Sequence, residues 1–181
     1  KSLEWQAKLQ FDETERLAVP KIVRLGREMA AEGVDAILIS CAADPAVPEL
    51  RGELKIPVIG AGSSVAAVAL SLAERIGVLN LTEGAPGPVL SLLGKRFVGE
   101  ASPEGVQNTL DLMTDWGKEA ALVAARRLAE SGASALVLAC TGYATIGMAQ
   151  ELRQRMGIVA VDPVRAAGLI TWYALGLPKA G

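Results

Sequence analysis

The sequence has 181 residues, a formal net charge of −2, no histidine and two cysteines; 51% of its residues are hydrophobic and only 4% are aromatic. This composition predicts an aliphatic core of helices packed on a parallel sheet, in one large domain or two small lobes, and argues against the basic surface that binds nucleic acid. It also excludes Ser-His-Asp and Cys-His catalysis, histidine-ligated metals, and zinc or iron–sulfur sites, so that no metal and no cofactor is expected.

The first part of the chain alternates between strand and helix signals. Its predicted elements are an edge strand, a long helix, a strand, a short helix, a second strand and an alanine-rich helix, at residues 1–10, 13–32, 35–40, 48–55, 57–59 and 64–75. Asp44 precedes a proline and is predicted to cap the short helix. The second strand ends in Gly60-Ala61-Gly62-Ser63-Ser64, a turn whose N–H groups can reach an anion at the start of a helix. Gly62, Ser63 and Ser64 are therefore candidate substrate-binding residues.

The alternation continues to the end of the chain. We predict a strand at 76–81 that closes the first lobe, then a short helix at 85–94 and a short strand at 96–99. A long helical region at 103–131, with a break near Gly117, leads to the second cysteine strand at 135–139. A helix at 144–156, a strand at 158–161 and a final helix at 163–175 follow. Thr82 at the end of the first of these strands is a further candidate. Asp162 is predicted to cap the final helix. Tyr143 could line the pocket or pack against a neighbouring helix, and packing is the preferred interpretation.

Two stretches repeat one pattern. Glu32–Cys41 reads EGVDAILISC and Ser131–Cys140 reads SGASALVLAC, so a glycine, an apolar run and a closing cysteine recur in register. Small residues, a helix and a second apolar run follow each copy, which predicts two βαβ units with a cysteine where parallel strands bind ligands. We expect one lobe at residues 33–102 around Cys41, a second from 1–32 and 103–181 around Cys140, and two thiols facing one cleft.

Paired thiols suit the inversion of a carbon acid. A lone cysteine at a strand end is more often a buried apolar residue, but here both cysteines end a strand and precede a small-residue loop. One thiolate can remove a proton from one face of a stereocentre while the opposite thiol delivers a proton to the other face. Hydrogen-bond donors beside the substrate would stabilise the developing charge, and Thr141 and Gly142 join the candidate binding residues for that reason.

These residues resemble the aspartate/glutamate racemase superfamily, and CAADPAVPELR, IPVIGAG, LACTGY and VDPVRAAG are most similar to its hydantoin racemase-like branch. The resemblance implies an α/β fold of two pseudo-symmetric lobes with mostly parallel sheets, and a cofactor-independent racemase with Cys41 and Cys140 as its acid and base. It implies a small-molecule substrate, a hydantoin, amino acid or related carboxylate, and a homodimer or higher even oligomer. Gly142 stands where glutamate racemases carry histidine, which disfavours glutamate. The superfamily's first strand is not found in this sequence.

Other functions remain open at this point. A maleate isomerase-like enzyme of the same superfamily also keeps two cysteines, and a binding protein could keep the pocket without turnover. A disulfide between Cys41 and Cys140 would instead make the pair a redox centre. The polar start of the chain is unlike a signal peptide, and no apolar run is long enough to cross a membrane. With only two cysteines, these features predict a cytoplasmic protein.

Overall fold

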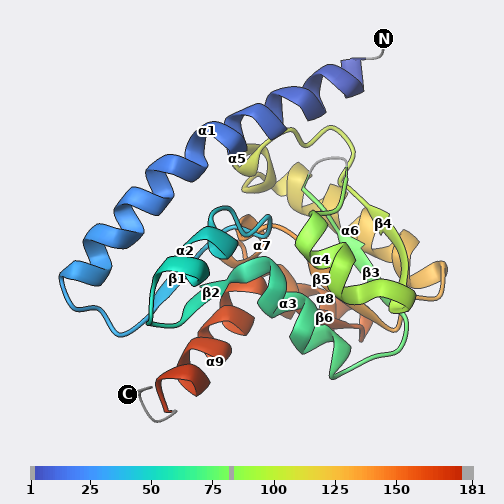
Figure 1. The fold of residues 1–181 in the computed structure, drawn as a ribbon. Helices are drawn as coiled ribbons and strands as arrows, with labels where there is room; N and C mark the ends of the chain where they lie inside the picture. The colour runs from blue at the N-terminus through green and yellow to red at the C-terminus, as the bar shows by residue number, and fades with distance from the viewer. Residues whose placement is uncertain (1–2, 82–83, 177–181) are drawn as a thin grey trace.

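The computed structural model describes residues 3–81 and 84–176, with side chains from residue 17 onward in those ranges. Strands and helices alternate along this part of the chain (Figure 1). The strands are β1 (Ile37–Ile39), β2 (Val58–Gly60), β3 (Ile76–Leu79), β4 (Phe97–Ala101), β5 (Ala135–Leu138) and β6 (Val159–Val161). The helices are α1 (Leu3–Ala31), α2 (Val47–Glu53), α3 (Ala61–Leu70), α4 (Gly87–Leu93), α5 (Thr109–Leu112), α6 (Asp115–Glu130), α7 (Gly142–Thr145), α8 (Met148–Met156) and α9 (Pro163–Leu175), with a 3-10 turn, η1, at Gly94–Arg96.

The strands form two parallel sheets, as the α/β prediction requires. The small sheet pairs β1 with β2, and the large sheet has the order β4-β3-β5-β6. The strand expected to close the Cys41 lobe, β3, instead lies between β4 and β5 in the large sheet. Every residue of β3 and β5 is buried, and such continuous apolar strands take the centre of a sheet covered on both faces. Strand pairing therefore divides the chain before β3, and not near residue 102.

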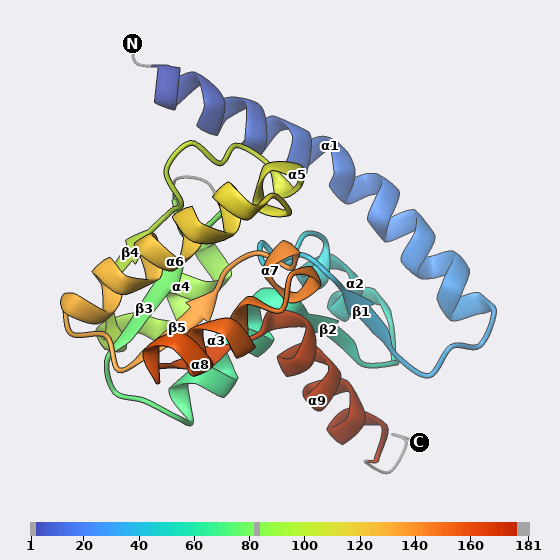
Figure 2. The same ribbon diagram turned by 180° about the vertical axis from the view of Figure 1, so that it is seen from behind.

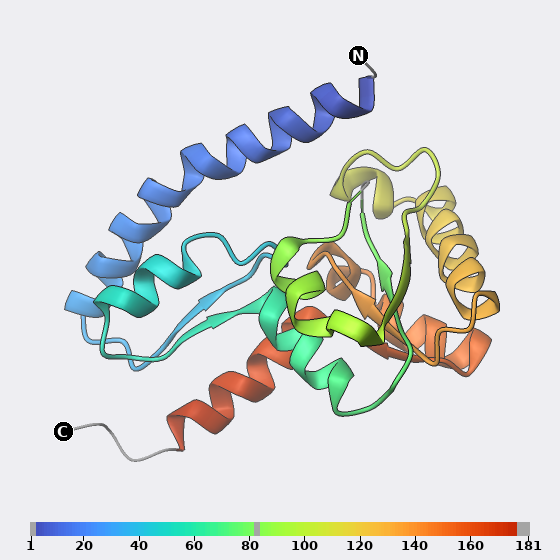
Figure 3. The same cartoon turned by 45° about the vertical axis from the view of Figure 1, so that its right-hand side comes forward.

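Helices cover both faces of the large sheet (Figure 3). Leu136 and Leu138 of β5 pack in a cluster with apolar residues of α6 and α8. Val137, between them, packs in a second cluster with residues of α3 and α4. Successive side chains of a strand point to opposite faces, so the run of apolar residues before Cys140 serves two cores at once.

The small sheet lies between two groups of helices (Figure 2). Ile37 and Val58 pack with Leu50 of α2 and Val23 of α1, whereas Ile59 packs with Ala167 of α9. Because α9 follows β6 of the large sheet and contacts both α3 and β2, it joins the two halves of the molecule.

The edge strand predicted at residues 1–10 is wrong, because α1 begins at Leu3 and continues to Ala31. The segment LEWQAKLQ contains strong helix formers and no β-branched residue, and this local preference prevails. Pro20 lies inside the helix without ending it. Although α1 has 29 residues, none of the helices described here combines the length and apolar character needed to cross a membrane.

Two helical regions are interrupted at places other than those predicted. The region after Pro103 divides into α5 and α6 at Thr114, whose side chain accepts a hydrogen bond from the Gly117 N–H and so begins α6. The predicted helix at residues 144–156 is two helices, α7 and α8, separated by Gly147 with a φ of 67°. A residue in the left-handed conformation cannot continue a right-handed helix, and glycine adopts this conformation without strain.

Candidate active site

The repeated sequence pattern is also a repeated structure. Cys41 follows β1 and Cys140 follows β5, and in each copy a helix leads from the cysteine loop to a second, parallel strand. Both cysteines are half-buried thiols, not joined to each other. The Thr141 hydroxyl donates to the Ser40 carbonyl over 3.4 Å. This contact brings the residue after Cys140 against the residue before Cys41, so the two cysteine loops are neighbours.

The environment of Cys140 determines how readily its thiol ionises. Burial is the largest influence and raises the pKa of Cys140 above its ordinary value. The Gly142 N–H, 3.4 Å from Sγ, opposes this by stabilising the thiolate, and the charge of Cys41 raises the pKa further. A thiolate at Cys41 therefore disfavours a thiolate at Cys140.

Tyr143 anchors the start of α7, as its predicted packing role requires. Its side chain is fully buried, and its hydroxyl donates to the Asn80 carbonyl over 2.6 Å. Burial raises the pKa of Tyr143, so the phenol stays neutral and keeps its proton for this bond. Asn80, which follows β3, donates through Nδ2 to Glu100 over 3.1 Å, and its buried Oδ1 has no partner among the described residues. This network connects the loop after β5 to the ends of β3 and β4.

Asp44 does not cap α2, contrary to the prediction. Its buried carboxylate accepts hydrogen bonds from the Gly62 N–H over 2.6 Å and the Ser63 N–H over 2.7 Å, at the start of α3. The N-cap of α2 is Ala46, which has no side-chain oxygen to offer. The anion site predicted at the glycine-rich turn therefore exists, but a carboxylate of the protein itself fills it.

The remaining candidate residues have different surroundings. The Ser64 hydroxyl is buried and donates to the Gly60 carbonyl over 2.6 Å, and the Ser63 hydroxyl donates to the same carbonyl over 3.3 Å. These hydroxyls therefore bond within α3. Thr82 lies outside the described residues. Thr141 and Gly142 lie beside the Cys140 thiol or its loop contact, and Gly62 packs against the Ala42 carbonyl of the Cys41 loop.

Thr109 also lies beside the Cys140 loop, which the sequence interpretation missed. A Cβ added to Gly142 would lie 2.9 Å from Cγ2 of Thr109 and 3.4 Å from Sγ of Cys140. Asn108 fixes the start of α5 by accepting hydrogen bonds from two N–H groups of that helix. The Asn-Thr pair at a helix start was the available signal, but only the tertiary structure brings it to the thiol.

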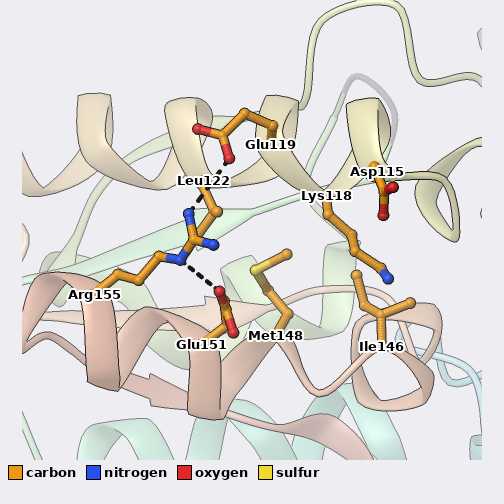
Figure 4. Close-up of a pocket in the computed structure, with 8 residues that line it drawn as sticks. All are labelled: Asp115, Lys118, Glu119, Leu122, Ile146, Met148, Glu151 and Arg155. Carbon is orange, nitrogen blue, oxygen red and sulfur yellow. Dashed lines mark ion pairs between the residues drawn. The ribbon is translucent and has the colours of Figure 1, made fainter.

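A surface cavity of about 380 Å³ lies between α6 and α8 (Figure 4). Arg155 is paired there with Glu119 over 3.5 Å and with Glu151 over 2.5 Å, and Lys118 and Asp115 lie at its other end. Neither cysteine lines this cavity, nor does any predicted binding residue. Three acidic and two basic side chains line it, and two of the carboxylates hold Arg155; with no thiol in its lining, this cavity is not the candidate catalytic centre.

Comparison with known proteins finds relatives that cover most of this chain. Residues 4–168 match the family described as Asp/Glu/Hydantoin racemase. The sequence is 30% identical to a hydantoin racemase of Rhizobium meliloti, over 94% of this chain and 72% of that protein, and 29% identical to one from Pseudomonas sp. (strain NS671), over 84% and 63%. Among solved structures, allantoin racemase from Klebsiella pneumoniae is similar with a TM-score of 0.78 and 25% identity, over 92% of this chain and 70% of that one. Glutamate racemase from Thermus thermophilus, at 18% identity, shares the fold with a TM-score of 0.63.

Proposed function

This chain belongs to the Asp/Glu/hydantoin racemase family and is thus an isomerase of the racemase type, and we propose that it inverts a stereocentre in a neutral, hydantoin-like ring with Cys41 and Cys140 as opposed acid and base. The observation that carries the proposal is the contact between the two cysteine loops. Cys41 and Cys140 follow equivalent strands, their loops touch through Thr141 and Ser40, and the charge of Cys41 raises the pKa of Cys140.

The coupling between the thiols supplies the protonation state that racemisation needs. Because a thiolate on one sulfur disfavours a thiolate on the other, the reactive state carries one proton on the pair. In one direction the Cys41 thiolate takes the proton from the ring carbon, the electron pair moves onto the adjacent carbonyl oxygen, and the Cys140 thiol protonates the opposite face. Cys140 is then the thiolate and Cys41 the thiol, which is the state that performs the reverse reaction.

Two observations favour a neutral ring over an acidic amino acid. Asp44 occupies the Gly62 and Ser63 N–H groups at the start of α3, so these two donors are not vacant for a side-chain carboxylate of the substrate. Neither cysteine loop, from residue 40 to 44 or from 140 to 144, contains lysine or arginine. A ring that contains amide groups presents its own N–H donors and carbonyl acceptors, and does not need a basic residue to bind.

Proton exchange in deuterium oxide tests this function. Single enantiomers of 5-substituted hydantoins, allantoin, aspartate, glutamate and maleate would be incubated with the purified protein at neutral pH. Proton NMR follows exchange at the stereocentre, and polarimetry follows inversion. We expect exchange with inversion for a ring substrate, and its loss in both Cys41→Ala and Cys140→Ala.

Other results would point to other functions. Exchange of aspartate or glutamate alone would contradict the ring proposal, and conversion of maleate to fumarate would identify an isomerase of a different kind. Binding of a ring compound without exchange would indicate a protein that keeps the pocket without turnover. Exchange that survives in both single variants would contradict the assignment of the two cysteines.

A further inference from the structure

The turn that carries Cys41 is built around Asp44. The Asp44 N–H donates to the Cys41 carbonyl over 3.1 Å, which closes a tight turn, and Asp44 has a φ of 53°. Asparagine, aspartate and glycine adopt this left-handed conformation more readily than other residues. The carboxylate of the same residue bonds two N–H groups of α3. One residue thus holds the Cys41 turn through its backbone and joins the turn to a helix through its side chain.

The second copy of the repeat begins its equivalent helix differently. α3 follows β2 and α9 follows β6, so the two helices occupy equivalent places. α9 is capped by its own N-cap residue, Asp162, which accepts from the Val164 N–H over 2.8 Å and the Arg165 N–H over 2.9 Å. α3 has Gly60 at the N-cap, which has no side chain. Its Gly62 N–H is instead capped by Asp44, 18 positions before Gly62. A side chain at the N-cap, such as Asp162 in α9, stabilises a helix start without any distant partner. The Asp44 carboxylate caps α3 and in addition fixes the Cys41 turn.

Close packing accompanies this arrangement. A Cβ added to Gly60 would lie 2.3 Å from the Asp44 carboxyl carbon, and one added to Gly62 would lie 1.9 Å from the Ala42 carbonyl oxygen. Real side chains do not approach so closely, so both glycines are required where the Cys41 turn meets α3. Asp44 is only 6% exposed, so its carboxylate is shielded from solvent where it bonds the start of α3.

We propose that Asp44 is a positioning residue for Cys41, an internal carboxylate that holds the Cys41 turn on the start of α3 and keeps substrate carboxylates out of that site. The proposal rests on the racemase function for its catalytic consequence, but not for its structural one. Without the carboxylate, two N–H groups at a helix start would lose their acceptor, and a small external carboxylate could take its place.

Chemical rescue in Asp44→Gly is the direct test. Glycine tolerates the positive φ and removes only the side chain. We expect kcat/KM for the ring substrate to fall about tenfold to a hundredfold, since a small displacement of a reacting group has effects of this size. Sodium formate should restore part of the rate along a saturation curve, whereas sodium chloride at equal ionic strength should not.

Asp162→Gly is the matched control, because it removes the equivalent cap from α9 and leaves the Cys41 turn intact. It should lose a similar amount of stability, keep the rate of the parent protein and show no rate response to formate. Asp44→Asn provides a second variant that keeps the turn conformation and one acceptor oxygen. We expect its rate to lie between those of the parent and Asp44→Gly.

A thiol measurement separates failure of this proposal from failure of the racemase function. Cys41 and Cys140 are the only two cysteines, so the Cys140→Ser background reports Cys41 alone. Asp44→Gly should change the iodoacetamide alkylation rate of Cys41, formate should return it toward the parent value, and Asp162→Gly should leave it unchanged. If Asp44→Gly and Asp44→Asn both leave Cys41 alkylation unchanged, or if formate has no effect on either measurement in Asp44→Gly, the positioning role is wrong, whatever the substrate proves to be.

Discussion

The two cysteine loops share a sequence pattern but are held by different forces. The Cys41 loop is fixed by a charge: the Asp44 carboxylate bonds the start of α3 within the same half of the repeat. The Cys140 loop is fixed by a neutral group, because Tyr143 donates to the Asn80 carbonyl at the end of the neighbouring strand β3. Two thiols at equivalent places in the repeat therefore do not need equivalent support. What the repeat preserves is the place of each sulfur at a strand end.

The difference matters for two-base catalysis. A carboxylate near one thiol and a phenol near the other give the two sulfurs unlike electrostatic surroundings. In the proposed mechanism each thiol alternates between acid and base, and a catalyst accelerates the reaction in both directions. The two loops can thus differ in construction without favouring one enantiomer at equilibrium, which the catalyst cannot alter.

The largest expected effect compares a glycine from each loop region. Gly62→Ala would drive a methyl group into the Ala42 backbone, which cannot move without displacing Cys41. We expect it to lower the free energy of unfolding by about 3 kcal/mol, the upper end of common overpacking effects, and to abolish racemisation. Gly142→Ala meets only side-chain atoms, of Thr109 and Cys140, and should cost about 1 kcal/mol. Urea unfolding of both variants measures the difference, and equal costs would contradict the comparison.

A smaller effect is expected for the support of the Cys140 loop. Tyr143→Phe keeps the buried ring and removes the hydroxyl, so the Asn80 carbonyl loses its donor beside the already unpartnered Asn80 Oδ1. Leaving a buried acceptor unpaired costs about 1–3 kcal/mol. The variant should also react more slowly as a racemase, with a larger change in kcat than in KM, because α7 carries the Gly142 N–H that faces Sγ of Cys140. A change in KM alone would argue that Tyr143 serves binding instead.

The coupling between the thiols predicts a change in titration. In Cys41→Ser the charge that raises the pKa of Cys140 is absent, so the pH midpoint for alkylation of Cys140 should move downward. The midpoint should remain above that of an ordinary thiol, about 8.5, because burial is the larger cause and is unchanged. The rate of alkylation by iodoacetamide, followed from about pH 6 to about pH 10, measures the change in the midpoint for Cys140. An unmoved midpoint would mean that the sulfurs do not interact.

The smallest effect concerns stability at alkaline pH. The pKa of Cys140 is raised in the folded state, so the unfolded chain loses this proton first as the pH rises. The contribution of Cys140 is fully present below the unfolded thiol pKa of about 8.5 and decreases as the pH rises through the folded value. Denaturant unfolding should therefore give a smaller decline above that pH for Cys140→Ser than for the parent protein. Parallel curves would show that this thiol does not contribute.

The repeat predicts where each cysteine lies in the fold. Cys41 and Cys140 were placed at strand ends because each apolar run is long enough for one buried strand and stops at the cysteine. The α/β class and the parallel pairing within each copy follow from the same pattern. The repeat does not specify how strands of different βαβ units are ordered. The prediction that β3 closes the Cys41 lobe is therefore wrong, because β3 lies between β4 and β5.

The misplaced Asp44 illustrates a second limit. Asp-Pro before a helix is a local capping signal, and the sequence alone favoured α2, three residues away. Asp44 instead caps α3, whose own N-cap residue, Gly60, has no side chain that could accept a hydrogen bond. Capping over 18 residues depends on the packing of the Ala42 backbone against Gly62, which no local pattern contains. Thr109 was missed for the same reason.

The path of α9 has a consequence for the order in which the protein is made. The ribosome releases β1, β2 and α3 early, and the Asp44 contact can form as soon as Ser63 has emerged. The small sheet nevertheless waits for Ala167, which lies more than 100 residues later, to cover Ile59. A chain that stops before Ala167 therefore leaves Ile59 without this cover, although the residues of the Asp44 contact are present. Docking of α9 completes the second core of that sheet.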